Sequence, residues 1–369
     1  MRLSRGPLAA MCVALALCAA TASASAEDLI DSVKTVRPRA TLSAFLVKPA
    51  TAAADKRDFP RAIVLYQALA IARGPGSPEA RKLATMWTLA AQNEEAARVL
   101  EAYAAATTDP TARAEARAEA QRLSAPDPFK KDLVLPTLDA EAKQAFKLGR
   151  AAFAKQQWGD ALIYFHMGYT LAPDLPGFLR ELGATYEKLD AKAKKVDFYR
   201  AYLQRRPFGK NADTIRAELG KDKHALGRLD LASALPCEEV WINRQRMPGK
   251  LPQKGLLVAP GRYKAMCLSL KYEIAVFEYA TVEAGKTATL RFDWAVVVNQ
   301  LDNPLGRIAI EHPHRAGALL DLGVTSREVG VVVASDGRAL KMVVKDDTGT
   351  RVEERSVRIR PGERYVVKW

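Results

Sequence analysis

The chain has 369 residues, of which 27% are charged and 49% hydrophobic, and its formal net charge is +14. This length predicts two or three domains. Lys and Arg alternate with Asp and Glu instead of forming long basic runs, so the composition argues against nucleic-acid binding and leaves acidic partners such as anionic envelope polymers or lipid headgroups.

Residues 1–26 have the pattern of an export signal. Arg2 and Arg5 form a basic start, residues 8–20 are apolar, and Ala24-Ser25-Ala26 is a small-residue cleavage site. We therefore expect cleavage near Ala26 and an exported protein, periplasmic or secreted.

Two observations bear on membrane attachment. A lipoprotein signal would anchor the chain at Cys18, but such a signal needs a small residue just before the cysteine, where Leu17 stands. No later stretch approaches the ~18 to 20 uninterrupted apolar residues of a membrane span. The mature chain is expected to lack a transmembrane segment.

Cys237 and Cys267 are the cysteines that remain after the signal is removed. An oxidising compartment permits them to form a disulfide. The alternative is two buried free thiols. A zinc site is not expected, because no further cysteine remains and the histidines are scattered.

The chain up to about Arg228 is rich in Ala, Leu, Arg, Lys and Glu, with apolar residues at helical spacing. Leu148-Gly149 recurs as Leu182-Gly183, and Pro173 as Pro207, each 34 residues later. The pattern predicts paired helices at 142–154 with 159–171 and at 178–189 with 194–204, and a final capping helix at 212–219.

The first pair resembles the tetratricopeptide repeat. That repeat has Leu-Gly in its first helix, a small residue and an aromatic in its second, and a terminal Pro, which here are Leu148, Gly149, Ala161, Phe165 and Pro173. The second pair departs from the pattern at Lys195, where a small residue is expected.

A degenerate pair of repeats is expected further upstream. A helix opened by Pro60 carries residues that recur 34 positions later, namely Ala62, Tyr66 and Leu69 against Ala96, Leu100 and Tyr103. Pro49 is expected to interrupt the helix before them. We therefore expect helical repeats over 27–123, a linker at 124–139, and repeats with a capping helix over 140–226.

The resemblance implies a partner-binding groove along the first helices of successive repeats. Its positions are Lys143, Phe146, Arg150, Phe153, Arg180, Glu187 and Lys188. The family's carboxylate-binding arrangement needs an Asn where Arg150 and Ala184 stand, so that mode is not expected. The alternative interpretation of these residues is a solvated charged face.

After about Leu229, short Val, Ile, Leu, Phe and Tyr runs between Gly and Pro predict strands. They are expected at 240–243, 255–258, 262–268, 275–282 and 287–294. Three further segments repeat earlier ones after about 77 residues: Gly306–Ile308 repeats Gly227–Leu229, Gly337–Met342 repeats Gly261–Met266, and Pro361-Gly362 repeats Ala284-Gly285. We therefore expect two tandem β domains, at 227–296 and 297–369.

Each expected β domain resembles a PEGA domain, a small envelope-associated β module. The resemblance lies in a turn, Ala259–Arg262, that leads into a strand, and in a second turn, Glu283–Lys286, that leads into the last strand. The four-letter motif that names the family is absent, and the second copy has Ser335–Arg338 at the first turn.

The sequence offers no catalytic constellation. His312-Pro313-His314 reads as a turn with exposed histidines, and the nucleophile elbow, phosphate loop and His-Glu-x-x-His motif are missing. We expect no enzyme activity, no cofactor and no metal. Trp241, Tyr263, Phe277 and Tyr279 could form a sugar-stacking strip, although strand alternation places some of them in the core.

The predicted fold class is α+β multidomain: an all-α tetratricopeptide-like solenoid followed by two small β-sandwich-like PEGA-type domains. The predicted function is a non-enzymatic envelope scaffold that binds a protein or peptide through its helices, while the β modules contact another envelope component. The alternative is a binder of cell wall, that is peptidoglycan, or of another polysaccharide through the β modules.

Overall fold

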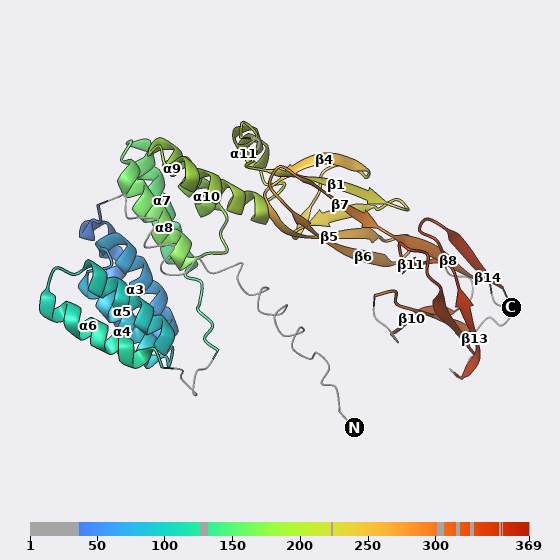
Figure 1. The fold of residues 1–369 in the computed structure, drawn as a ribbon, viewed down its shortest axis with the longest axis horizontal. Coiled ribbons are helices and arrows are strands. Elements are labelled where there is room, and N and C mark those ends of the chain that lie inside the picture. Colours follow the sequence, from blue (N-terminus) through green and yellow to red (C-terminus); the bar gives the residue numbers. More distant parts are fainter. Residues whose placement is uncertain are drawn as a thin grey trace, which may run out of the picture. The chain divides into compact units, whose positions relative to one another are not determined.

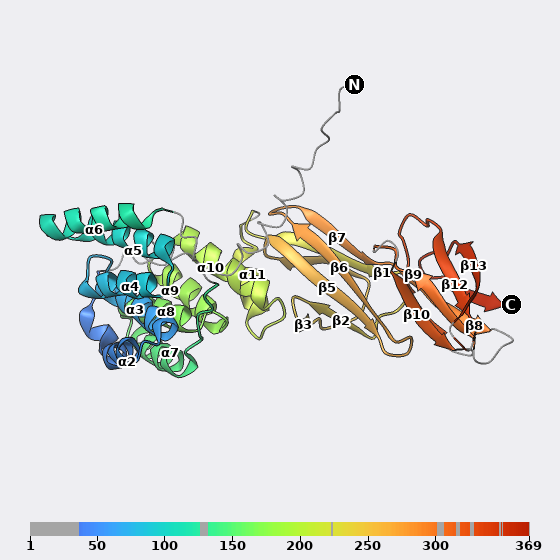
Figure 2. The same cartoon turned by 90° about the horizontal axis from the view of Figure 1, so that it is seen from below.

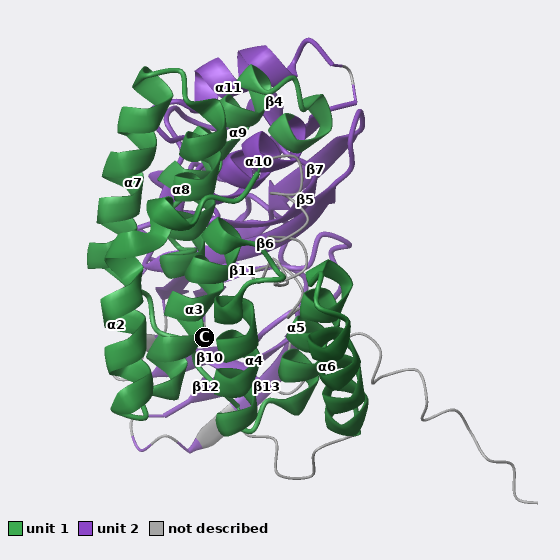
Figure 3. Ribbon diagram, turned by 90° about the vertical axis from the view of Figure 1, so that its left-hand side faces the viewer, with its two compact units in different colours: residues 1–195 green, residues 196–369 purple. Residues whose placement is uncertain are grey.

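The computed structural model describes residues 37–125, 132–222, 224–300, 306–314, 318–324, 328–346, 348 and 350–368. The expected export signal and part of the expected linker lie outside these residues. Contacts divide the chain into two compact units, residues 1–195 and 196–369, coloured green and purple in Figure 3. The described strands all lie in the second unit, which confirms an α+β composition.

The first unit is an array of helices (Figure 1). Its elements are η2 (Ala40–Ser43), α2 (Ala44–Asp55), α3 (Phe59–Arg73), α4 (Pro78–Leu89), α5 (Asn93–Ala106), α6 (Pro110–Leu123), α7 (Asp139–Ala154), α8 (Trp158–Leu171) and α9 (Gly177–Lys188). Helix α10 (Lys192–Arg205) begins in this unit and ends in the second. The paired helices predicted from the 34-residue repeat are present, with small shifts at their ends.

Polar side chains followed by proline begin three of these helices. Asp58, Ser77 and Asp109 each accept a hydrogen bond from a backbone N–H of the first turn in α3, α4 and α6. Proline stands at the first or second position of each helix, where its missing N–H costs nothing. Each cap contributes about 1 kcal/mol.

Pro49 lies inside α2, so the expected interruption of that helix is wrong. Proline removes one helical hydrogen bond. Leu46, Ala50 and Ala53 are buried along the same helix, which packs against α3. The packing of this apolar face holds the helix through the proline.

The order of the helices in space differs from their order in the chain. Helix α3 packs against α4 and also against α8, which follows it only after the segment between α6 and α7 (Figure 3). Two ion pairs span this contact region, Arg39 with Asp160 at 3.1 Å and Arg61 with Glu141. Helix α8 therefore lies beside α3, although α4 to α7 separate the two helices in the chain.

The second unit begins with the end of α10 and with α11 (Ala212–Leu219), which was expected to cap the helical array. The Nε of Arg216 donates to the carbonyl of Leu257 at 2.8 Å, and the Nε2 of Gln204 donates to that of Pro260 at 2.9 Å. These bonds attach the helical segment to the β strands that follow.

The first β module contains two sheets. Its strands are β1 (Gly227–Ser233), β2 (Glu239–Ile242), β3 (Gln245–Arg246), β4 (Gln253–Val258), β5 (Gly261–Ser269), β6 (Ile274–Val282) and β7 (Thr287–Phe292). The strand orders are β4-β1-β7 and β3-β2-β5-β6. A buried core that includes Tyr263 and Phe292 lies in this module.

The second β module repeats this topology. Its strands are β8 (Trp294–Gln300), β9 (Arg307–Glu311), β10 (Leu319–Val324), β11 (Glu328–Val332), β12 (Leu340–Lys345), β13 (Arg351–Val357) and β14 (Arg364–Lys368). The strand orders β11-β8-β14 and β10-β9-β12-β13 match those of the first module strand for strand. In each module the first strand pairs antiparallel with the fourth and parallel with the last.

The matching topology shows that one of the three predicted segment repeats is wrong. Gly306–Ile308 leads into β9, which corresponds to β2, whereas Gly227–Leu229 lies in β1. The two segments therefore lie on strands that are not equivalent, because the counterpart of β1 is β8 and not β9. The second module begins at Trp294, and the expected boundary between residues 296 and 297 falls inside β8.

Strand β8, which Figure 2 shows among the strands of the second module, contributes side chains to both β cores. Trp294, Val296 and Val298 belong to the core of the first module, while Ala295 and Val297 belong to that of the second. Successive side chains of a strand point to opposite faces, so an apolar run without polar alternation fits a strand buried on both sides. Strand β8 therefore packs against the cores of both β modules, one on each of its sides.

Candidate functional site

The residues expected to line the groove lie on α7 and α9, the first helices of consecutive hairpins. We call this surface the α7–α9 face and define it by Lys143, Phe146, Arg150, Phe153, Arg180, Glu187 and Lys188. The two helices are joined by side chains: the ring centroids of Phe146 and Phe178 lie 5.4 Å apart, and Arg150 Nη1 lies 3.1 Å from Glu181 Oε2.

The two aromatics of the face are partly buried. Phe146 packs against Phe165 at 5.9 Å as well as against Phe178, and Phe153 packs edge-on against Trp158 at 4.8 Å. These contacts place both rings between helices. Their first role is therefore to hold the hairpins together, and only their outer edges are left for a ligand.

Arg150 and Arg180 converge on the buried carboxylate of Glu181. Arg150 donates to Glu181 Oε2, and Arg180 Nε donates to Oε1 at 3.1 Å. The side chain of Glu181 is 3% exposed, while those of Arg150 and Arg180 are 55% and 34% exposed. One buried anion thus orients two cations at the surface, an arrangement that charge-assisted bonds make strong.

The remaining positions of the face are at its surface. Lys143, Glu187 and Lys188 are exposed, and Glu187 lies 3.9 Å from Lys195. The face therefore presents more positive than negative charge.

Two buried polar residues of this unit were not predicted as site residues. Glu181 falls on the buried stripe of α9 with Phe178, Leu182 and Thr185, a spacing that could have identified it. His166 is 0% exposed and its Nε2 lies 2.9 Å from the hydroxyl of Tyr186. Burial and then the charge of Lys194 lower the pKa of His166 to about 3.

In the β half, the four aromatics of the expected strip fall on two sides of one sheet. Tyr263 points into the core, is 0% exposed, and donates its hydroxyl proton to the carbonyl of Ala259 at 2.7 Å. Phe277 and Tyr279 on β6 are 48% and 52% exposed, and Trp241 on β2 is half-buried. Alternation along the strands separates Tyr263 from the other three.

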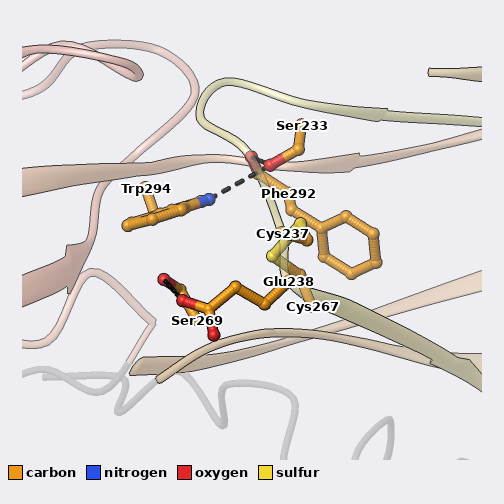
Figure 4. The surroundings of a disulfide bond; sticks show 7 residues. All are labelled: Ser233, Cys237, Glu238, Cys267, Ser269, Phe292 and Trp294. Atoms are coloured by element: carbon orange, nitrogen blue, oxygen red, sulfur yellow. Dashed lines mark hydrogen bonds between the residues drawn. A yellow bond between two sulfur atoms is a disulfide. The ribbon is translucent and has the colours of Figure 1, made fainter. Parts of the chain in front are cut away.

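The predicted disulfide between Cys237 and Cys267 is present (Figure 4). It joins the segment that enters β2 to β5, close to Phe292 and Trp294. Beside it, Glu238 accepts hydrogen bonds from Ser269 Oγ at 3.1 Å and from the backbone N–H of Lys271 at 2.9 Å. The hydrogen bond from Lys271 lowers the pKa of Glu238.

Among the described residues, no group of three or more His, Cys, Asp or Glu side chains could hold a metal ion. His312 and His314 lie in a turn, with ring centroids 5.9 Å apart. Within the same residues, no helix is long and apolar enough to cross a bilayer.

Comparison with known proteins adds little to this geometry. No protein-family model matches the chain, and no curated protein matches it. Among solved structures, the TPR2AB domain of yeast Sti1 in its pHSP90 complex aligns with 50% of this chain and 73% of its own, at 13% identity and a TM-score of 0.23. MamA protein aligns with 49% of this chain and 96% of its own, at 17% identity and a TM-score of 0.18. TM-scores this low do not establish a structural relationship between either protein and this chain.

Proposed function

We propose that this chain is a non-enzymatic scaffold of the cell envelope whose helical unit binds a protein or peptide through the α7–α9 face. The observation that carries the proposal is the joining of two consecutive first helices by Arg150 with Glu181 and by Phe146 with Phe178. This joining makes one continuous surface from two repeats. Lys143 and Lys188 are exposed on it, so an acidic partner surface would be complementary.

We propose further that the helical unit contains degenerate tetratricopeptide repeats and that the β modules are distantly related to PEGA domains. The 34-residue repeat and the close approach of Gly149 to Phe165 support degenerate tetratricopeptide repeats in the helical unit. The turns before β5 and β7 support a distant relation of the β modules to PEGA domains. In this proposal the β modules contact a second envelope component.

Export is proposed from the signal-like residues 1–26. Expression of the full chain in a bacterium, followed by fractionation and mass measurement, tests it. A periplasmic product that begins at Glu27 is expected. A cytoplasmic product that retains Met1 or begins at residue 2 would contradict export.

The binding proposal is tested by affinity capture with the full mature chain from a cell-envelope extract. The double variant Lys143→Glu with Lys188→Glu should reduce recovery of the bound protein by about tenfold, because it reverses two charges of the face. The matched control, Arg117→Glu with Arg122→Glu, makes the same charge change on exposed positions of α6 and should retain recovery. Equal loss in both variants, or in neither, would contradict the proposal.

The alternative function, binding of peptidoglycan or another polysaccharide by the β modules, ranks second. Sugar rings are usually held against open aromatic faces. Lys264 Nζ lies 4.5 Å above the ring of Phe277, and the Arg262 guanidinium lies 5.1 Å above that of Tyr279, so both rings already carry cations. Co-sedimentation of the full chain with purified peptidoglycan would favour this alternative.

A further inference from the structure

The outer surface of the β5–β6 hairpin carries a combination of aromatic and basic residues that the core does not need. We call it the β5–β6 face and define it by Arg262, Lys264, Phe277 and Tyr279. Lys264 pairs in register with Tyr279 on the neighbouring strand. Because alternate residues share a side of the sheet, all four side chains project away from the buried Tyr263 and Val276.

The aromatic rings of the β5–β6 face hold its cations in place. Lys264 Nζ lies 4.5 Å from the centroid of Phe277 and 5.8 Å from that of Tyr279, and Arg262 lies over Tyr279. A cation above a ring is attracted by the negative charge of the ring face. The rings thus restrict the conformations of the two side chains. The side chains therefore lose less conformational entropy when a ligand binds them.

Glu239, an acidic residue on the adjacent strand β2, has partners other than Arg262 and Lys264. Glu239 on β2 lies 3.2 Å from Arg246 and accepts a hydrogen bond from Trp241 Nε1 at 2.9 Å. The described contacts of the Lys264 ammonium group are with the rings of Phe277 and Tyr279.

The second β module provides an internal comparison. Its equivalent hairpin, β12–β13, places Lys341 2.9 Å from Glu354, and Arg355 pairs with Glu353 on β13 itself. The same strand framework thus accepts neutralised charges at this hairpin. The cation and aromatic combination is particular to the first module and is not a requirement of the fold.

The spacing of the two cations indicates the form of the ligand. Arg262 and Lys264 are two residues apart on one strand, so their Cα atoms are separated by about 7 Å at a rise of ~3.3 Å per residue. Alternate residues of an extended peptide have the same spacing. We propose that the β5–β6 face binds an extended acidic segment of a protein partner, whose alternate carboxylates pair with Arg262 and Lys264. This second site lies in the β half and does not depend on binding by the α7–α9 face.

The test uses the full mature chain and a fluorescent synthetic peptide of alternating Glu and Thr, with the Gln and Thr peptide as a neutral control. Fluorescence anisotropy at low salt should show binding of the acidic peptide alone. Lys264→Gln and Arg262→Gln should each weaken it by about three- to tenfold, since each removes one charge pair. The matched control Lys254→Gln, on exposed β4 of the other sheet, should change the affinity by less than about twofold.

Two further measurements make the result decisive. Lys143→Glu with Lys188→Glu should leave peptide binding intact, which separates this site from the helical face. Polygalacturonate and dextran, an anionic and a neutral glycan, serve as competitors. The proposal is overturned if the acidic peptide does not bind, if Lys254→Gln weakens it as much as Lys264→Gln, if the helical double variant abolishes it, or if Lys264→Gln abolishes glycan binding instead. Thermal unfolding of each variant confirms that it is folded.

Discussion

The backbone at Gly149 approaches Phe165 so closely that a Cβ at that position would lie 2.6 Å from the ring atom Cε1. Both residues belong to the 34-residue repeat, one in the first helix of the hairpin and the other in the second. A glycine within a helix lowers helix stability by about 1 kcal/mol relative to alanine. The close approach explains why glycine stands here, because any side chain would overlap the ring of Phe165.

Gly149→Ala is expected to destabilise the chain by about 1–3 kcal/mol, because the steric overlap outweighs the gain in helix propensity. Chemical denaturation measures the change. Gly177→Ala is the matched control, since a Cβ there would lie 3.8 Å from Phe146, an ordinary contact. A Gly149→Ala protein as stable as the control would contradict the close packing of the hairpin.

The buried His166 should make stability depend on pH. Its pKa is about 3 in the folded chain and near 6.5 when unfolded, so below pH 6.5 the unfolded state binds a proton that the folded state does not. The free energy of unfolding should therefore fall between pH 6.5 and 3, by up to about 1.4 kcal/mol per pH unit from this group.

Denaturation at several pH values compares wild type with His166→Gln, which should show a shallower decline. The control His224→Gln alters an exposed histidine and should keep the wild-type slope. Identical slopes in all three proteins would show that His166 is not buried in its neutral form.

The Cys237–Cys267 disulfide closes a loop across a sequence separation of 30 residues. Replacing both cysteines with alanine should cost about 2–4 kcal/mol, because the unfolded chain regains the freedom of that loop. Denaturation of the double variant measures the loss. Non-reducing mass measurement of the wild type should lack two hydrogens, and two titratable thiols would refute the bond.

The shared strand β8 should couple the two β modules. Val296 and Val297 belong to different cores, so truncation of either to alanine opens space on one side of the strand. Hydrogen exchange should then show reduced protection in both modules. Thr281→Ala, on the exposed side of β6, is the control and should leave protection unchanged. An effect of Val297→Ala confined to the second module would contradict coupling through β8.

Local patterns in the sequence predicted much of the secondary structure. Pro60 marks the start of α3, and Pro173 follows the end of α8, as predicted. Gly149 marks the predicted close approach of two helices. These features depend mainly on neighbouring residues. The pairing of Cys237 with Cys267 also followed, because few cysteines remained to choose from.

Features that depend on distant residues were not predictable in the same way. The packing of α8 against α3 joins helices that are far apart in the chain, and such a contact leaves no periodic signal in the sequence. The two roles of β8 appear only once strand partners are known, since Trp294–Val298 reads as a single apolar run. The buried stripe of α9 could have identified Glu181 as buried, but its ion pair with Arg150 could not be predicted, because Arg150 lies on another helix.

Site-specific photo-crosslinking in living cells tests whether the α7–α9 face holds a protein partner. A photoreactive residue is placed at Lys143, at Lys188 or, as the control, at Arg117 of the full chain, and the products are identified by mass spectrometry. We expect positions 143 and 188 to capture the same protein and position 117 not to capture it. Identical products from all three positions, or none from positions 143 and 188, would contradict this expectation.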